Sequence, residues 1–432
     1  MVPLVSGLLA AAVCAALLYA GRRDLTHPAV AFGAVWFLFV AAAQLELTGY
    51  QHEWSATFAV VAIAGGLAFV AGAGVAAGTG RLRGGPPRLD AIQPRSLVLV
   101  AVLLLLGGVA GLAWKASILG GVPLFSGDVD VVRSRAYGFD GGSRVPAPST
   151  FLTNGFHIAA WCALLATALR WRDWSRLQRA AALAFTAVCV VGAFAGGSRN
   201  SLLFALAVPI VVAYLCSGRM PRRHAMALGG VVLVLVATAS FVFAARISQR
   251  GGSGETFYAR IIDEQPTALR PLMPVYIAGT YGLETYRRAF DAFPQRFSYT
   301  AGGSELTSMP DAAFPKGKPR VGGLFGALSW DGPGAPTWTV ASYQGRAYAD
   351  FGPAGALLVS LLFGLLLGAV YRIARERRTL WALVAAAFSV YVAAFMVYDN
   401  LLSFSVAVVY DLTVVAVALA IASGRLPTAR RR

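Results

Sequence analysis

Arginine side chains beside glycine and aromatic residues recur along this chain of 432 residues. A guanidinium group is planar, permanently charged and less strongly hydrated than an ammonium group, so it can hold two oxygens of a phosphate in a partly dry site. Several such groups close together would bind a diphosphate and stabilise it as it departs. Six arginines lie in such surroundings: Arg133, Arg135, Arg199, Arg246, Arg250 and Arg346.

Signatures of other chemistry are missing from the sequence. It contains no Gly-rich nucleotide-binding motif, no HExxH pair and no GxSxG turn. The four cysteines all fall within apolar runs, and the four histidines are scattered: His27, His52, His157 and His224. We therefore expect neither a metal ion nor a cofactor nor a disulfide.

The elements that must position the arginines are apolar. The composition is 57% hydrophobic and 13% charged, whereas a soluble protein carries about 25% charged residues. A run of ~20 apolar residues can cross a bilayer, and its backbone must then be helical to satisfy its own hydrogen bonds. The sequence predicts an all-α polytopic integral membrane protein with about 11 transmembrane helices, at 3–20, 29–46, 56–79, 96–114, 151–169, 180–196, 200–216, 225–245, 353–371, 380–397 and 401–422.

Basic residues gather in every second connection between these runs. Because positive residues mark the cytoplasmic side, we expect the N-terminus outside and the C-terminus inside the plasma (inner) membrane. The net charge of +17 then orients the protein, and since it is spread over short loops it does not indicate nucleic-acid binding. The basic connections hold 21 Arg against four acidic residues and are 21–28, 81–95, 170–179, 217–224, 372–379 and 423–432.

One polar interruption, 246–352, is much longer than the others and falls on the outward side between helices 8 and 9. Loops of this length are uncommon unless they are functional or disordered, and its aromatic, Gly and Pro content indicates a folded one. We expect a membrane domain at 1–245 with an outer loop at about 116–150, the large extracytoplasmic loop as a lid or acceptor-binding cover, and a second membrane domain at 353–432 with a basic cytoplasmic tail.

Three further charged residues have simpler interpretations. Arg287 and Arg288, in the middle of the long interruption, are interpreted as a solvated helix face. Asp411, within the last span, is the only acidic residue at membrane depth. It either has a function there or bonds one helix to another.

Four further segments stand out in the sequence: GVPLFSGDVDVVRSRAYG, GGSRNSLL, PVYIAGTYGLETY and YQGRAYADFGPAGALLVSLLFGLLLG. In these segments and their order the chain resembles the bacterial oligosaccharide repeat unit polymerases, the Wzy-like O-antigen and capsule polymerase family. The resemblance implies a metal-independent glycosyltransferase of the GT-C type that joins undecaprenyl-diphosphate-linked glycan units outside the plasma membrane. By motif position, Arg199 and Arg346 would bind the lipid diphosphate, with Arg133 or Arg135 in support.

Such a transfer needs a group that takes a proton from the attacking hydroxyl. Asp350, Glu284 and Glu305 are candidates between which the sequence does not choose. We predict Arg199, Arg346 and Asp350 as catalytic residues. The predicted substrate-binding residues are Arg133, Arg135, Arg246, Arg250, Tyr281, Glu284 and Tyr343. The expected partners are a polyprenyl-diphosphate-linked oligosaccharide, the lipid bilayer, and flippase and chain-length regulator proteins, with no nucleic acid.

Two alternatives stay open at the level of sequence. An O-antigen-ligase-type enzyme, or another polyprenyl-phosphate-dependent glycosyltransferase, would share the arginines but use a different acceptor. A polysaccharide transporter or flippase would show internal repeats, broken helices and ionisable residues in mid-membrane. No internal repeat is evident, and the charges gather at the outer rim, which favours chemistry at the interface.

Overall fold

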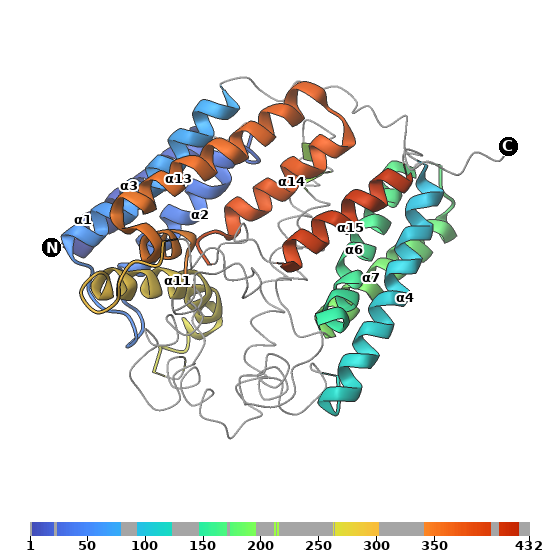
Figure 1. The fold of residues 1–432 in the computed structure, drawn as a ribbon, viewed down its shortest axis with the longest axis horizontal. Helices are drawn as coiled ribbons and strands as arrows, with labels where there is room; N and C mark the ends of the chain where they lie inside the picture. The colour runs from blue at the N-terminus through green and yellow to red at the C-terminus, as the bar shows by residue number, and fades with distance from the viewer. Residues whose placement is uncertain are drawn as a thin grey trace. The chain divides into compact units, whose positions relative to one another are not determined.

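The computed structural model of the protein describes residues 2–20, 24–78, 93–122, 147–170, 173–195, 211–212, 214–215, 262, 264–301, 341–398 and 406–422. They form helices joined by turns (Figure 1). The elements are α1 (Val2–Ala20), α2 (Pro28–Ala43), α3 (Ala56–Ala77), α4 (Pro94–Leu119), α6 (Ala147–Arg170), α7 (Arg176–Ala195), the 3-10 helix η2 (Arg270–Leu272), α11 (Met273–Ala292), α13 (Tyr343–Arg377), α14 (Leu380–Phe395) and α15 (Val406–Ala422).

Most of the described helices follow the predicted apolar runs, whereas η2 and α11 lie in the long interruption at 246–352. The run at 3–20 corresponds to α1, and the last run, 401–422, corresponds to α15. Five of the helices that the structure describes, α1, α3, α4, α7 and α13, are long and apolar enough to cross a bilayer. The protein is therefore an α-helical membrane protein. The predicted spans at 200–216 and 225–245 lie largely or wholly outside the described residues.

The chain divides into two compact units. Each unit combines segments that are far apart in the chain, because helices that are not consecutive pack together. The first unit is Met1–Arg83, Pro221–Arg378 and Ala385–Ser405, and the second is Gly84–Met220, Thr379–Val384 and Val406–Arg432.

In the first unit, α3 and α13 lie side by side and run in the same direction (Figure 1). Gly65 lies beside Gln344, and further along both helices Gly72 lies beside Leu361. A Cβ atom added to Gly72 would be 2.4 Å from the carbonyl oxygen of Leu361. Only a glycine permits so close an approach of the two backbones, since interiors are packed without spare room.

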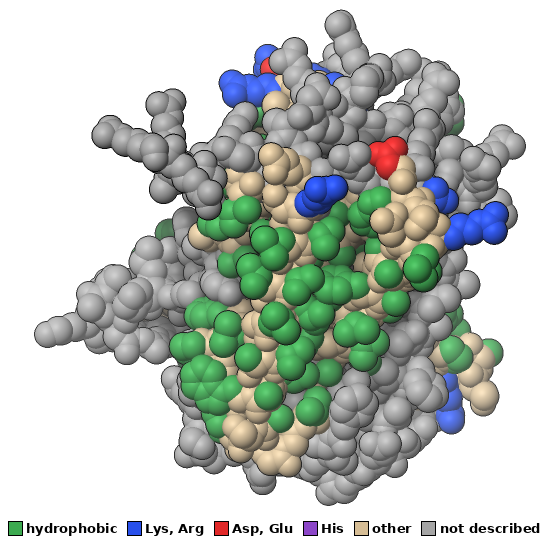
Figure 2. All heavy atoms as spheres, turned by 90° about the vertical axis from the view of Figure 1, so that its right-hand side faces the viewer, with side chains coloured by type: hydrophobic (Ala, Val, Ile, Leu, Met, Phe, Trp, Pro, Cys, Tyr) green, Lys and Arg blue, Asp and Glu red, His purple; other side chains and the backbone are tan. Residues whose placement is uncertain are grey.

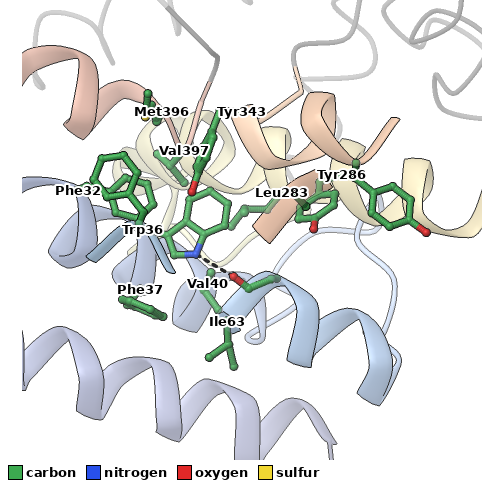
Figure 3. Packing of buried hydrophobic residues seen from close by; sticks show 14 of the residues in the cluster. Phe32, Trp36, Phe37, Val40, Ile63, Leu283, Tyr286, Tyr343, Met396 and Val397 are labelled. Atoms are coloured by element: carbon green, nitrogen blue, oxygen red, sulfur yellow. Dashed lines mark hydrogen bonds between the residues drawn. The ribbon is translucent and has the colours of Figure 1, made fainter. Parts of the chain in front are cut away.

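The core of the first unit is aromatic. Phe32 stacks on Phe69 with ring centroids 3.9 Å apart, and Trp36 meets Tyr343 edge-on at 5.5 Å. Trp36 also donates a hydrogen bond from Nε1 to the carbonyl oxygen of Ala62 at 3.3 Å. Figure 3 shows Phe32, Trp36 and Tyr343 together with side chains of α11 and of the segment after α14. The cluster thus joins helices from both ends of the chain.

Helix α13 is broken at Gly352, where φ is 72° and ψ is −162°. Such backbone angles are open essentially only to glycine, and the following Pro353 has no amide hydrogen to continue a helix. The part from Pro353 to Arg377 is about 37 Å long at 1.5 Å per residue, which is enough to cross the hydrocarbon. The predicted span at 353–371 lies within this part, and the helix begins ten residues before it, at Tyr343.

A short segment of the long interruption fills the break in α13. The amide of Thr300 donates to the carbonyl oxygen of Ala349 at 3.1 Å, and the amide of Ala301 donates to that of Asp350 at 3.0 Å. The break leaves these carbonyl groups without helical donors. The hydrogen bonds from residues 300 and 301 satisfy them, so the helix can end there without a buried unpaired acceptor.

In the second unit, α4 and α6 pack closely in opposite directions. A Cβ atom on Gly108 would lie 2.9 Å from the ring of Phe156, and one on Gly155 would lie 2.5 Å from the carbonyl oxygen of Leu104. Figure 2 shows a face of this unit whose middle is covered by apolar side chains. Apolar side chains on an outer surface suit contact with lipid, and those of α4 include Val98, Leu99, Val102, Leu103, Leu106 and Val109.

Candidate functional site

Helix α11 lies across one end of the first unit and belongs to the long interruption (Figure 1). Pro274 stands in its first turn, where a helix needs no amide hydrogen. Fourteen of its 20 residues are buried, and Leu283 and Tyr286 belong to the aromatic core. Helix α11 is therefore built into the first unit.

The connection between α2 and α3 is bound to one face of α11. Tyr276 donates from its hydroxyl to Oε1 of Gln51 at 2.7 Å and accepts from the amide of Leu47 at 3.2 Å. One turn further along α11, the hydroxyls of Tyr50 and Thr280 are 2.8 Å apart. Burial raises the pKa of Tyr276, so its phenol stays protonated and keeps donating.

The next turn of the same face carries Glu284, whose side chain is 2% exposed. Oε1 of Glu284 is 3.2 Å from Nδ1 of His52, 3.0 Å from Nη2 of Arg287 and 3.2 Å from Nε of Arg288. A buried carboxylate is costly unless it is paired and hydrogen-bonded, and these partners supply both. We call these four side chains the Glu284 cluster. It holds one buried carboxylate against two permanent positive charges, and Asp291 pairs with Arg287 from the more exposed side.

Arg287 and Arg288 correct the interpretation of a solvated helix face, which is wrong. Their side chains are only 11% and 15% exposed, and both are held by Glu284. Burial opposes the charge on Arg287, but hydrogen bonds and charge attraction from Glu284 and Asp291 outweigh it and raise the pKa of the guanidinium. The pair is therefore fixed in position as well as charged.

Arg346 and Asp350, both predicted as catalytic, lie on the part of α13 that precedes its break. The neighbour of Arg346 in the chain, Gly345, packs against α11, since a Cβ atom there would lie 3.0 Å from Cβ of Tyr286. Asp350 is only 1% exposed, and its carboxylate accepts a hydrogen bond from the hydroxyl of Thr300. The structure thus brings Arg346 to the same end of the unit as α11, and it places Asp350 in the closure of the broken helix.

Two predicted substrate-binding tyrosines are packed inside the unit. Tyr343 is fully buried; its hydroxyl donates to Oγ of Ser360 and accepts from Nε2 of Gln344, both at 3.0 Å. Tyr281 is 5% exposed, and its ring meets that of Tyr50 edge-on at 6.4 Å. Both geometries favour a packing role for these side chains.

Other predicted residues lie outside the part of the chain that the structure describes: Arg133, Arg135, Arg199, Arg246, Arg250 and Glu305. The structure adds His52, Arg287 and Arg288 to the site. The spacing of the two arginines, three and four residues after Glu284, is visible in the sequence and is typical of ion pairs on a helix. His52 offers no comparable signal, because its partner is 232 residues away in the chain.

The comparisons with known proteins give no relative. No protein-family model, no curated protein and no solved structure matches the chain.

Proposed function

We propose that this protein joins undecaprenyl-diphosphate-linked oligosaccharide repeat units into a polymer by glycosyl transfer at the outer face of the plasma membrane. The observation that carries the proposal is the meeting of α11 and the start of α13 at one end of the first unit. This arrangement gathers Arg287, Arg288 and Arg346 at one end. Guanidinium groups suit a diphosphate that binds and then departs, and those of Arg287 and Arg288 are held in position by Glu284.

The contacts at the two ends of the first unit support an outward position for this site. Residues 47–52, which the charge pattern assigns to the outside, are bound to α11 of the long outward interruption. At the other end of the unit, the phenol of Tyr371 donates to Asp24, which belongs to a basic connection assigned to the cytoplasm. The parallel packing of α3 and α13 also agrees, since both are expected to run from outside to inside.

The chemistry fits an activated donor. The sugar that is transferred carries its leaving group, the lipid diphosphate, so the protein needs to bind no nucleotide. The arginines would neutralise the charge that builds up on the bridging oxygen as the bond to the anomeric carbon breaks. The lipid chain of the donor would stay in the bilayer beside the apolar helices.

A ligase-type transferase is the second candidate, since the same arginines would bind the same donor. A transporter is favoured by one observation, the broken helix α13 with the buried Asp350 beside the break. Against it, the carbonyl groups at this break are already satisfied by the amides of Thr300 and Ala301. They are therefore not directed at a transported ion.

The test is to supply the purified protein with an undecaprenyl-diphosphate-linked oligosaccharide. The polymerase should produce a ladder of products that differ by one repeat unit and should release undecaprenyl diphosphate in step. Transfer to a different, added acceptor without a ladder would identify a ligase. If the donor is not consumed at all, the proposed function is wrong.

A further inference from the structure

His52 presents an exposed imidazole whose inner nitrogen is held by a buried carboxylate. Its side chain is 57% exposed, whereas that of Glu284, 3.2 Å from Nδ1, is 2% exposed. The other ring nitrogen, Nε2, is therefore on the part of the ring that does not contact Glu284. On α11, Glu284 contacts His52 and also binds Arg287 and Arg288, and Asp291 pairs with Arg287. Glu53 follows His52 in the chain.

The backbone that carries His52 is fixed by hydrogen bonds to α11. Residues four apart on a helix share a face one turn apart, and Tyr50 and His52 contact two such residues of α11. Tyr50 and His52 therefore meet Thr280 and Glu284 in register. A side chain used in catalysis needs this kind of support from neighbouring hydrogen bonds.

A carboxylate that accepts from Nδ1–H of a histidine fixes the tautomer and leaves Nε2 as a proton acceptor. Asp350, the acidic residue predicted for catalysis, is in a different situation. It is 1% exposed and already accepts from Thr300 where the helix breaks. Of the two groups, only the exposed ring of His52 can approach a sugar hydroxyl without a rearrangement of the fold.

We propose that His52 is the proton acceptor of the glycosyl transfer and that Glu284 positions it; this inference rests on the proposed function. The acceptor hydroxyl forms a bond to the anomeric carbon and gives its proton to Nε2. The bond between that carbon and the phosphate oxygen breaks, and the diphosphate leaves with the electron pair. Glu284 stabilises the imidazolium that forms at Nδ1, and the proton on Nε2 is later lost to water.

The test compares His52→Gln with the wild type in the purified assay described above. Glutamine keeps a donor for Glu284 but cannot accept a proton as imidazole does. We expect kcat to fall roughly 10²- to 10⁴-fold with KM for the donor nearly unchanged, and the decline of kcat/KM on acidification to disappear. His27→Asn is the matched control, because asparagine also caps a helix well and His27 caps α2 beside Tyr371, near Asp24.

Two outcomes separate the failure of this inference from that of the proposed function. If the wild type polymerises and His52→Gln keeps the wild-type rate and pH profile, the role of His52 is overturned but the proposed polymerase function is retained. If the wild type does not consume the donor, both the role of His52 and the proposed function are overturned. A fall caused by unfolding is recognised by a lowered thermal midpoint, and a variant with wild-type midpoint and wild-type rate contradicts the assignment.

Discussion

Gly72 and Leu361 bring two helix backbones into direct contact, because a Cβ atom on Gly72 would lie 2.4 Å from the carbonyl oxygen of Leu361. Gly72→Ala should therefore push α3 and α13 apart and cost about 1–3 kcal/mol. Gly74→Ala is the matched control on the same helix, since a Cβ atom there would have no neighbour within 4 Å. Thermal unfolding in mild detergent measures both. Equal midpoints for the two variants would show that the helices do not pack in this way.

The hydroxyls of two neighbouring tyrosines should respond differently to removal. Tyr286 is fully buried, and its hydroxyl has no hydrogen-bond partner among the residues that the structure describes. Tyr348 donates to the carbonyl oxygen of Phe293 at 3.3 Å. We expect Tyr286→Phe to be neutral or stabilising and Tyr348→Phe to lose about 1 kcal/mol. The reverse order in unfolding experiments would contradict this environment for Tyr286.

Alkaline solution should destabilise the protein through the same buried phenol. Burial raises the pKa of Tyr286 well above its ordinary value, with smaller contributions from Tyr343 and Tyr348. The stability linked to this shift is fully present below the ordinary phenol pKa of about 10 and is lost as the pH rises above it. Between about pH 9 and pH 11, Tyr286→Phe should lose less stability than the wild type. Parallel pH curves for the two proteins would count against the shift.

The Glu284 cluster should depend strongly on its carboxylate. Glu284→Gln removes the buried carboxylate that Arg287 and Arg288 share, so a loss of about 3 kcal/mol is expected. Asp291 pairs with Arg287 as well but is 56% exposed, and Asp291→Asn should cost at most about 1 kcal/mol. Chemical unfolding of both variants measures these changes in the free energy of unfolding. A Glu284→Gln protein as stable as Asp291→Asn would mean that the cluster does not hold the helix.

Removal of either predicted diphosphate-binding arginine should stop chain extension. Arg199→Ala and Arg346→Ala are expected to abolish polymer in cells while the protein still inserts, and Lys at either position should rescue poorly because the planar fork is lost. Arg372→Ala is a control on the same helix as Arg346, since Arg372 is 57% exposed and pairs with Glu376. Full-length polymer from both alanine variants would refute the assignment of these two sites.

Side-specific labelling tests the orientation. The three cysteines that the structure describes, Cys14, Cys162 and Cys189, are buried, so a cysteine placed on the surface should dominate the signal. A membrane-impermeant thiol reagent should label Glu53→Cys in intact cells and Glu376→Cys only after permeabilisation. The opposite pattern would invert the protein in the membrane and would remove the site from the outer face.

Most of the described helices coincide with apolar runs, because the hydrocarbon requires a minimum length of apolar helix, a property of each segment alone. Helix α11 lies in the long interruption and was not predicted in this way. The part of α13 before Gly352 is short and partly polar, so its sequence did not distinguish it from the long interruption at 246–352. Its stability comes from burial against Tyr286 and the segment at Thr300. The Glu284 cluster was predicted only in part, since the pairing of His52 with Glu284 depends on how the connection at 47–52 lies on α11. Such long-range contacts have no local pattern.

The aromatic core also bears on how the protein is made. Phe32, Trp36 and Phe69 pack on Tyr343, which leaves the ribosome long after they do. At about 5–20 residues per second, the delay between Phe69 and Tyr343 is roughly 15–55 s. During that time α2 and α3 are in the bilayer without the ring that completes their packing. Until then, α2 and α3 must remain in lipid or beside the insertion machinery. If translation stops before residue 343, the released protein lacks the ring that completes this packing and should be degraded.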